Sequence, residues 1–152
     1  MAKRSAGILM YRRKPHLEVL LVHPGGPFWA KKDLGAWSIP KGEYGPGEEP
    51  LAAARRELEE ETGKRVEGDV VPLGDVVQPG RKVVTAFALE GELDPAQLRS
   101  NAFELEWPPR SGRKQSFPEV DRAAWFSPEE AQRRIVAGQR ELISRLLAML
   151  GS

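Results

Sequence analysis

A loop followed by an acidic helix, between Gly42 and Gly63, constrains the fold of this chain more than any other segment. Three glycines and two prolines lie between Gly42 and Pro50, and both residue types favour turns over a regular helix. Proline suits the first position of a helix, the following residues are good helix formers, and Gly63 suits a left-handed cap. The sequence therefore predicts a helix from about Pro50 to Thr62.

The predicted helix separates its apolar residues from its acidic ones. The apolar face consists of Leu51, Ala54, Leu58 and Thr62. Glu57, Glu60 and Glu61, spaced by three and four residues, are expected on the opposite side, where they can coordinate a cation. Carboxylate oxygens are hard ligands, so we expect Mg²⁺ or Mn²⁺. Zinc would favour His or Cys, and the chain has two histidines and no cysteine.

An acidic run of this kind is also common on a solvated helix face. Ion pairs from Arg55 to Glu59 and from Arg56 to Glu60 would then stabilise the helix by roughly a few tenths of a kcal/mol each. The acidic run alone favours this second interpretation, and the spacing of the whole segment favours the first.

The whole segment resembles the signature of the Nudix hydrolases. The matching positions are Gly42, Glu48, Arg56, Glu57, Leu58, Glu60, Glu61 and Gly63, preceded by Trp37 to Gly42. Lys64 departs from the family pattern, which usually has an aliphatic residue there, and this affects the packing at the helix exit more than the chemistry. The resemblance covers nearly the whole chain and implies an α/β fold, the Nudix α/β/α sandwich with a mixed β-sheet, in a single domain over residues 1–152.

The resemblance also implies a metal-dependent hydrolase that cleaves a diphosphate linkage. The metal ligands that it implies are the carbonyl of Gly42 and the side chains of Glu57, Glu60 and Glu61, around one to three Mg²⁺ or Mn²⁺ ions. Arg56 is expected to orient Glu57 or Glu48 through a charge-assisted contact, which leaves Glu48 a structural role.

The general base is not fixed to one position in this family. Some members use a glutamate of the signature helix, and others use one from a distant loop. Glu119, shortly before an aromatic strand end, is the best distant candidate, and Glu104 and Glu106 are weaker ones. A solvated loop acid explains Glu119 equally well, so the sequence leaves the base open.

Substrate contacts are expected from cations and aromatic rings. Lys41 directly precedes Gly42 and is a candidate for binding phosphate. Arg110, Arg113 and Lys114 could close over the phosphates, although a solvated basic loop fits them equally well. The aromatic side chains that could stack on a base, or that pack in the core instead, are Trp37, Tyr44, Trp107 and Phe117. His16 and His23 carry no motif.

The substrate class is expected to be a dinucleoside polyphosphate or a nucleoside triphosphate. The segments Ala6–Arg12, Trp37–Gly42 and Glu119–Phe126 are similar in arrangement to dinucleoside polyphosphate hydrolases, and the single-domain plan fits a nucleoside triphosphate pyrophosphohydrolase equally well. The alternative is a nucleotide-binding sensor of the same fold that does not hydrolyse its ligand. Such proteins usually carry a damaged signature, whereas every glutamate is present here.

Composition sets the remaining expectations. A chain of 152 residues can bury one sizeable core. A formal net charge of +1 gives no general attraction to nucleic acid or to a membrane, so the expected partner is a small nucleotide, with a homodimer as the common arrangement in the family. The absence of cysteine fits a cytoplasmic location. The apolar stretch Ala6 to Tyr11 is too short for a signal peptide core or a spanning helix.

The rest of the chain alternates β-forming runs with turns. Strands are expected at Ala6–Arg12, Leu17–His23, Ala36–Pro40, Val70–Gln78, Lys82–Glu90, Ala102–Trp107 and Ala123–Phe126. The segment from Pro108 to Pro118 is predicted to be a long mobile loop. Pro128 opens a helical region that Gly138 divides. The packing face of its second half is predicted to be Leu142, Leu146, Leu147 and Leu150.

Overall fold

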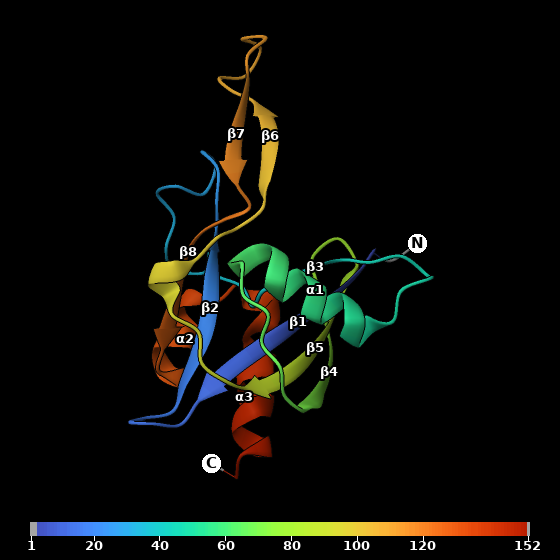
Figure 1. Ribbon diagram of the computed structural model, residues 1–152, viewed down its shortest axis with the longest axis vertical. Coiled ribbons are helices and arrows are strands. Elements are labelled where there is room, and N and C mark those ends of the chain that lie inside the picture. The colour runs from blue at the N-terminus through green and yellow to red at the C-terminus, as the bar shows by residue number, and fades with distance from the viewer. Residues whose placement is uncertain (1–2, 152) are drawn as a thin grey trace.

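A mixed β-sheet between two layers of helices forms the body of the computed structural model, which describes residues 3–151 (Figure 1). Its strands are β1 (Lys3–Arg12), β2 (Glu18–Pro24), β3 (Lys41–Glu43), β4 (Val70–Gln78), β5 (Lys82–Glu90) and β8 (Val120–Phe126). The strand order is β4-β5-β1-β2-β8, and β3 pairs with the first half of β1. β1 and β5 run parallel, whereas the other pairs are antiparallel.

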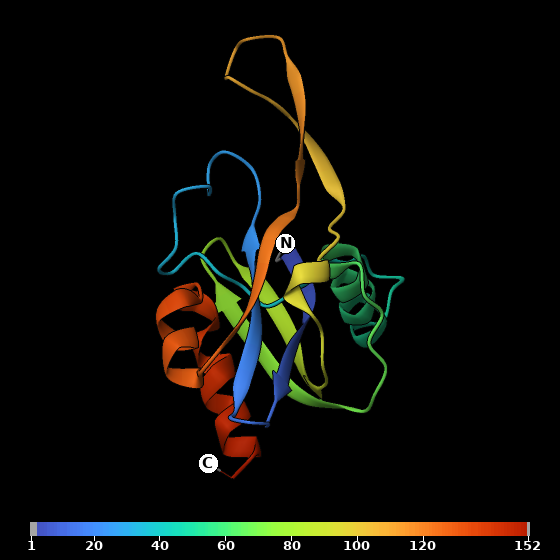
Figure 2. The same cartoon turned by 60° about the vertical axis from the view of Figure 1, so that its left-hand side comes forward.

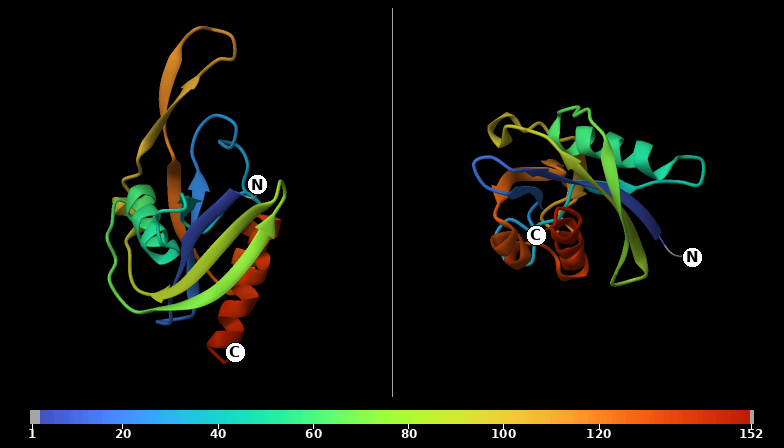
Figure 3. Two further views of the ribbon diagram at one scale, coloured as in Figure 1. Left: turned by 90° about the vertical axis from the view of Figure 1, so that its right-hand side faces the viewer. Right: turned by 90° about the horizontal axis from the view of Figure 1, so that it is seen from below.

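Helices cover both faces of this sheet. α1 (Pro50–Thr62) lies on one face, and α2 (Pro128–Arg134) and α3 (Arg140–Met149) lie on the other (Figure 3). Side chains alternate between the faces of a strand, so Ile8 and Met10 of β1 pack under α1, while Leu9 and Tyr11 pack under α2 and α3. The predicted α/β/α sandwich with a mixed sheet is confirmed.

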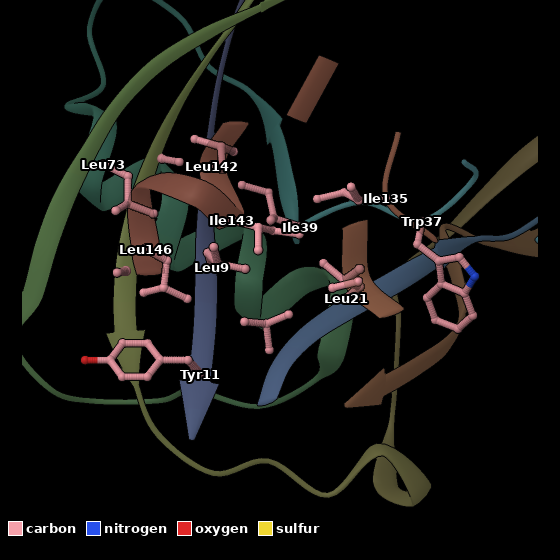
Figure 4. Close-up of a cluster of buried hydrophobic side chains, with 14 of the residues drawn as sticks. Leu9, Tyr11, Leu21, Trp37, Ile39, Leu73, Ile135, Leu142, Ile143 and Leu146 are labelled. Atoms are coloured by element: carbon pink, nitrogen blue, oxygen red, sulfur yellow. The ribbon is translucent and has the colours of Figure 1, made fainter. Parts of the chain in front are cut away.

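The core beneath α2 and α3 holds the chain in place just before the signature segment. Its fully buried side chains include Leu9, Leu21, Ile39, Ile135, Leu142 and Leu146 (Figure 4). Burying one such side chain contributes about 1.5–3 kcal/mol. Of the face predicted for α3, Leu142 and Leu146 are buried, and Leu147 and Leu150 are partly buried against the same cluster. This core holds Ile39 in place, two residues before Lys41.

Several elements have the predicted bounds, but the strand predicted at Ala36–Pro40 is wrong. α1, β4 and β5 begin and end where the sequence indicates. At Trp37 and Ser38 the backbone makes only isolated bridges, to Ile135 and Val22, and the strand begins at Lys41. Pro40 explains the break, because it has no N–H to donate to a neighbouring strand.

Among residues 3–151, no helix is both long and apolar enough to cross a membrane.

The predicted mobile loop at Pro108–Pro118 is also wrong over its second half. β7 (Lys114–Pro118) pairs with β6 (Ala102–Glu106) as a separate two-stranded sheet, and this β6–β7 hairpin projects from the body (Figure 2). Phe103 lies opposite Phe117, with ring centroids 6.1 Å apart. Such cross-strand aromatic pairs stabilise a hairpin by roughly 0.2–1 kcal/mol, and this one joins two segments that lie far enough apart to be treated separately in the sequence.

Candidate active site

Glu57 lies at the contact between α1 and β3. Its side chain is buried, with a relative exposure of 7%, and its carboxyl group fills the space where a side chain at Gly42 would stand. The Glu57 side chain is therefore buried and not on a solvated helix face, because the bare backbone of Gly42 leaves room for it. Burial raises the pKa of Glu57, and the charge of Glu60 raises it further, while Arg56 opposes both effects.

Three carboxylates converge beside this contact. Glu57, Glu61 and Glu119 each offer an oxygen, and these atoms all lie within 4.8 Å of one another. Burial raises the pKa of Glu61 to about 8, and the charge of Glu57 adds to the shift. The backbone N–H of Lys41 donates to Glu61 at 3.3 Å and partly opposes it. Burial also raises the pKa of Glu119. Carboxylates this close favour either protonation or a shared cation.

The donor set of this cluster fits a hard divalent cation. Glu57, Glu61 and Glu119 present only carboxylate oxygens, which Mg²⁺ and Mn²⁺ prefer and which suit zinc less well. The raised pKa values point the same way: burial and then the charges of neighbouring glutamates disfavour the ionised forms, and a bound cation would offset both effects.

Backbone hydrogen bonds bring Glu119 to the end of α1. The N–H of Glu119 donates to the carbonyl of Asn101 at 2.7 Å, and the N–H of Asn101 donates to the carbonyl of Glu60 at 2.8 Å. The hydroxyl of Ser100 accepts from the N–H of Val120 at 2.9 Å. The last carbonyls of a helix have no partner within the helix, so they are free to dock such a segment. The C-terminus of α1 thus holds the bend between β7 and β8 that carries Glu119.

Arg56 ties together the acids behind the cluster. Its Nε and Nη2 donate to the two oxygens of Glu48 at 2.8 and 3.0 Å, and its Nη1 donates to Glu57 at 2.7 Å. These contacts agree with the expectation that Arg56 holds Glu48 and Glu57, and they hold the pKa of Glu48 below its usual range. Nη1 also pairs with Glu60 at 2.9 Å. Glu60, which the sequence analysis counts among the metal ligands, therefore lies in this ion pair and outside the three-carboxylate cluster.

A cleft of about 500 Å³ extends from the carboxylates. Its charged lining residues are Glu61, Glu119, Lys41 and Lys82, and its less polar ones include Trp29, Pro79, Val136, Ala137 and Gly138. Burial lowers the pKa of Lys41, although the charge of Glu61 partly opposes this. The cleft thus combines acids, cations and apolar surface.

One wall of the cleft is a buried amide network centred on Gln139, which is fully buried. Its Oε1 accepts from the N–H of Ile39 at 3.0 Å, and its Nε2 donates to Ser38 Oγ at 3.0 Å and to Gln78 Oε1 at 3.1 Å. Because its polar atoms are satisfied, this wall is rigid.

The predicted basic cluster lies away from the cleft. Arg110, Arg113 and Lys114 are exposed at the far end of the β6–β7 hairpin, and within residues 3–151 the cleft lining does not include them. Glu104 and Glu106 are on β6, outside the three-carboxylate cluster. Of the acids suggested as a distant base, Glu119 is the one that joins the cluster.

The aromatic candidates pack mainly against other side chains. Trp37 is buried in the core, Tyr44 packs beneath α1, and the Phe117 and Trp107 rings lie against Phe103 and Phe28. The aromatic ring in the cleft lining is instead Trp29, which was not among the predicted site residues. Its signal was a tryptophan in a glycine-bounded loop followed by two lysines. Lys82 and Gln139 were also missed, and neither belongs to a local motif.

Comparisons with known proteins agree with this geometry. The family model described as NUDIX domain matches residues 1–146. An RNA pyrophosphohydrolase from Erythrobacter litoralis is 34% identical over 158 residues, covering 93% of each protein. An octanoyltransferase from Myxococcus xanthus is 36% identical over 137 residues, which is 90% of this chain but 34% of that protein, so the chain spans about a third of its length.

Solved structures share the fold at low sequence identity. A binary complex of a Caenorhabditis elegans Ap4A hydrolase has a TM-score of 0.68 at 22% identity, over 97% of this chain and 98% of that one. The NUDIX domain of Shewanella oneidensis NrtR, complexed with ADP ribose, also has a TM-score of 0.68, at 16% identity, over 99% of this chain and 89% of that one. At these identities the likeness concerns the fold alone.

Proposed function

The chain belongs to the NUDIX family, and from this premise we propose that it hydrolyses a diphosphate linkage with the help of a divalent cation. It is a hydrolase of phosphoric anhydrides in nucleotide derivatives. The proposed substrate is a dinucleoside polyphosphate or a nucleoside triphosphate. The observation that carries the proposal is the convergence of Glu57, Glu61 and Glu119 beside Lys41 at the cleft.

Glu57 and Glu61 are the proposed ligands of Mg²⁺ or Mn²⁺, with the Gly42 carbonyl and Glu60 as further candidates, and Glu119 lies beside them in the same cluster. When bound, the cation supplies charge neutralisation on the phosphate oxygens and activation of the attacking water. Support for Gly42 comes from its backbone, which lies against the Glu57 carboxyl group. Glu60 would have to share or leave its contact with Arg56 in order to take part.

The chain's own side chains have distinct proposed roles. Lys41 and Lys82 bind the phosphates, and Trp29 provides a surface for the base. Glu119 is the proposed general base, because it is the distant acid that joins the carboxylate cluster, and burial raises its pKa, which strengthens it as a base. Water attacks a phosphorus atom, Glu119 takes its proton, and the bond from that phosphorus to the bridging oxygen breaks. Arg56 is a positioning residue that orients Glu57.

The wider setting remains proposed as well. We propose a single domain over residues 1–152, a cytoplasmic location and a homodimer. The two hydrophobic clusters support a single domain, because they lie on opposite faces of one sheet.

A substrate panel tests the proposed function. It would contain nucleoside triphosphates, Ap4A, ADP-ribose and an RNA with a 5′-triphosphate, the last because of the name of the Erythrobacter litoralis relative. Products would be identified by mass spectrometry with Mg²⁺, Mn²⁺ or EDTA. Cation-dependent cleavage within a diphosphate supports the proposal. Binding of nucleotide without turnover across the panel would instead favour the non-hydrolytic sensor.

Metal affinity is expected to rise with pH. The pKa of Glu61 is raised to about 8 in the metal-free protein, so a cation must displace a proton from Glu61 below that pH. Calorimetric titration with Mn²⁺ should therefore give tighter binding and less proton release at about pH 8.5 than at about pH 6.5. An affinity that stays constant over this range would contradict the assignment of Glu61 as a ligand.

A further inference from the structure

A buried histidine lies behind the cleft, and the reaction as described does not use it. His23 is fully buried at the end of β2, with its ring edge-on to Trp37 at a centroid distance of 5.2 Å. Its Nδ1 lies 2.8 Å from Asp121 Oδ1, and its Nε2 lies 2.6 Å from the carbonyl oxygen of Lys32. Both partners are acceptors, so a neutral ring donates a hydrogen bond to one of them and a protonated ring donates to both.

The contact between His23 and Asp121 lies at a β-bulge in β8, the strand that follows Glu119. β2 and β8 pair His23 with Arg122 and then Pro24 with Val120, so Asp121 is an extra residue in β8. An extra residue of this kind re-aims the neighbouring side chains. Directly beyond it, the N–H of Gly25 donates to the carbonyl of Glu119 at 2.9 Å. The His23–Asp121 contact thus holds the register that directs Glu119 toward the other carboxylates.

The second contact supports the turn that carries Trp29, another residue of the cleft lining. The N–H of Lys32 donates to the carbonyl of Trp29 at 2.9 Å, which closes a turn, and His23 holds the carbonyl of Lys32 at the end of that turn. Trp29 lines the cleft from this turn. The His23 ring therefore contacts both Asp121, which follows Glu119 in the chain, and the turn that carries Trp29.

We propose that His23 is a positioning residue that aligns Glu119 through Asp121 and Trp29 through the carbonyl of Lys32. The inference rests on the proposed function for its kinetic consequences, since Glu119 and Trp29 have their roles there. The contacts of His23 are themselves independent of that function.

Two substitutions separate the two contacts. The amide nitrogen of Asn corresponds to Nδ1, and that of Gln corresponds to Nε2, so each variant retains one donor. His23→Gln keeps the contact to Lys32 and releases Asp121, so kcat should fall by about 10- to 100-fold, the range found when partners that orient ligands are lost. Its KM should change little.

His23→Asn keeps the contact to Asp121 and releases Lys32. Its kcat should stay within about threefold of the wild-type value, and its KM should rise by about fivefold as the stacking surface loosens. His16→Gln is the matched control, because His16 is exposed and should tolerate the change. Equal losses of kcat in both His23 variants, as expected from general loosening, would overturn the proposal. So would wild-type kinetics in both.

A double-mutant cycle tests whether His23 acts through Glu119. In a Glu119→Gln background, His23→Gln should cause little further loss of kcat, because the group that it positions is already disabled. Losses that multiply independently would overturn the link. The Asp121→Ala variant should reproduce His23→Gln, whereas Asp121→Asn, which keeps an oxygen acceptor, should fall between it and the wild type.

Amide exchange tests the positioning without any substrate. In ¹⁵N-labelled protein, the Gly25 N–H that bonds to Glu119 should exchange faster in His23→Gln than in His23→Asn, while core amides of β1 stay equally protected. Equal Gly25 exchange in the two variants would overturn the proposal. If the wild type hydrolyses nothing, the proposed function fails, yet this measurement still decides the role of His23.

Discussion

The Glu61→Gln variant is expected to lose hydrolytic activity while its metal-free form becomes more stable at high pH. Glu61 lies in the three-carboxylate cluster, and loss of even an outer-shell partner of a metal site typically costs about 10- to 100-fold in affinity or activity. Loss of a direct ligand should cost at least about 100-fold in kcat. Steady-state hydrolysis with Mg²⁺, on a fold checked by circular dichroism, measures this loss.

The gain in stability follows from the sign of the pKa shift. The fold raises the pKa of Glu61 to about 8, so the folded state favours the protonated carboxyl group. The free energy of unfolding of the metal-free wild type should therefore fall as pH rises from the ordinary glutamate pKa to about 8. Gln cannot ionise, so the variant should have the higher Tm in EDTA at about pH 9, with little difference at about pH 5.

Glu59→Gln is the matched control for this experiment. Glu59 is on the same helix but exposed, and it lies outside the carboxylate cluster. It should keep both wild-type activity and the wild-type response of Tm to pH. An active Glu61→Gln variant would contradict the assignment of Glu61 as a ligand.

Adding one methyl group at Gly42 is expected to disable the site from the opposite side. A Cβ at this position would occupy the space of the Glu57 carboxyl group, so Gly42→Ala must displace either Glu57 or β3. Overpacking of this kind costs about 1–3 kcal/mol. A displacement of about 1 Å in a catalytic arrangement can reduce the rate by about 100-fold. Urea unfolding and kcat measure the two effects.

Gly45→Ala provides the comparison in the same loop. A Cβ at Gly45 meets nothing within 4 Å, and its φ lies outside the left-handed region. The free energy of unfolding should therefore change by less than about 1 kcal/mol, and kcat should stay unchanged. If the two alanine variants had the same free energy of unfolding and the same kcat, Glu57 would have room to move. The close packing against Gly42 would then contribute neither to stability nor to activity.

The signature segment and its helix could be predicted because their determinants are local. Proline at the start of α1 and Gly63 at its end define a helix within one stretch of sequence, and the bounds agree. The burial of Glu57 could not be predicted in this way. It depends on Gly42, which is distant along the chain from Glu57 but in contact with it in the fold. Periodicity alone places Glu57 on the face opposite the apolar residues and does not show whether that face is covered.

The cleft walls have no local signature. Gln139 reaches Ile39 and Ser38 across about a hundred residues of sequence, and it follows a glycine that indicates only a helix break. The β6–β7 hairpin was obscured for a different reason: its composition favours a loop, while its stability comes from Phe103 facing Phe117. The cleft wall at Gln139 and the β6–β7 hairpin both depend on contacts between distant segments, and the periodicity of one segment does not reveal such contacts.

The base of the β6–β7 hairpin has a consequence for how chains of this fold diversify. Asn101 and Glu119 flank the hairpin and are joined directly by a backbone hydrogen bond of 2.7 Å. The ring closed by that bond holds Glu119 whatever the length of chain inserted within it. The hairpin also lies against the loop after β2, where Phe28 meets Trp107 and the ring of Phe103 lies close to Gly26. A chain of this fold could therefore carry a longer or shorter hairpin tip, beyond these contacts, without rebuilding the carboxylate centre.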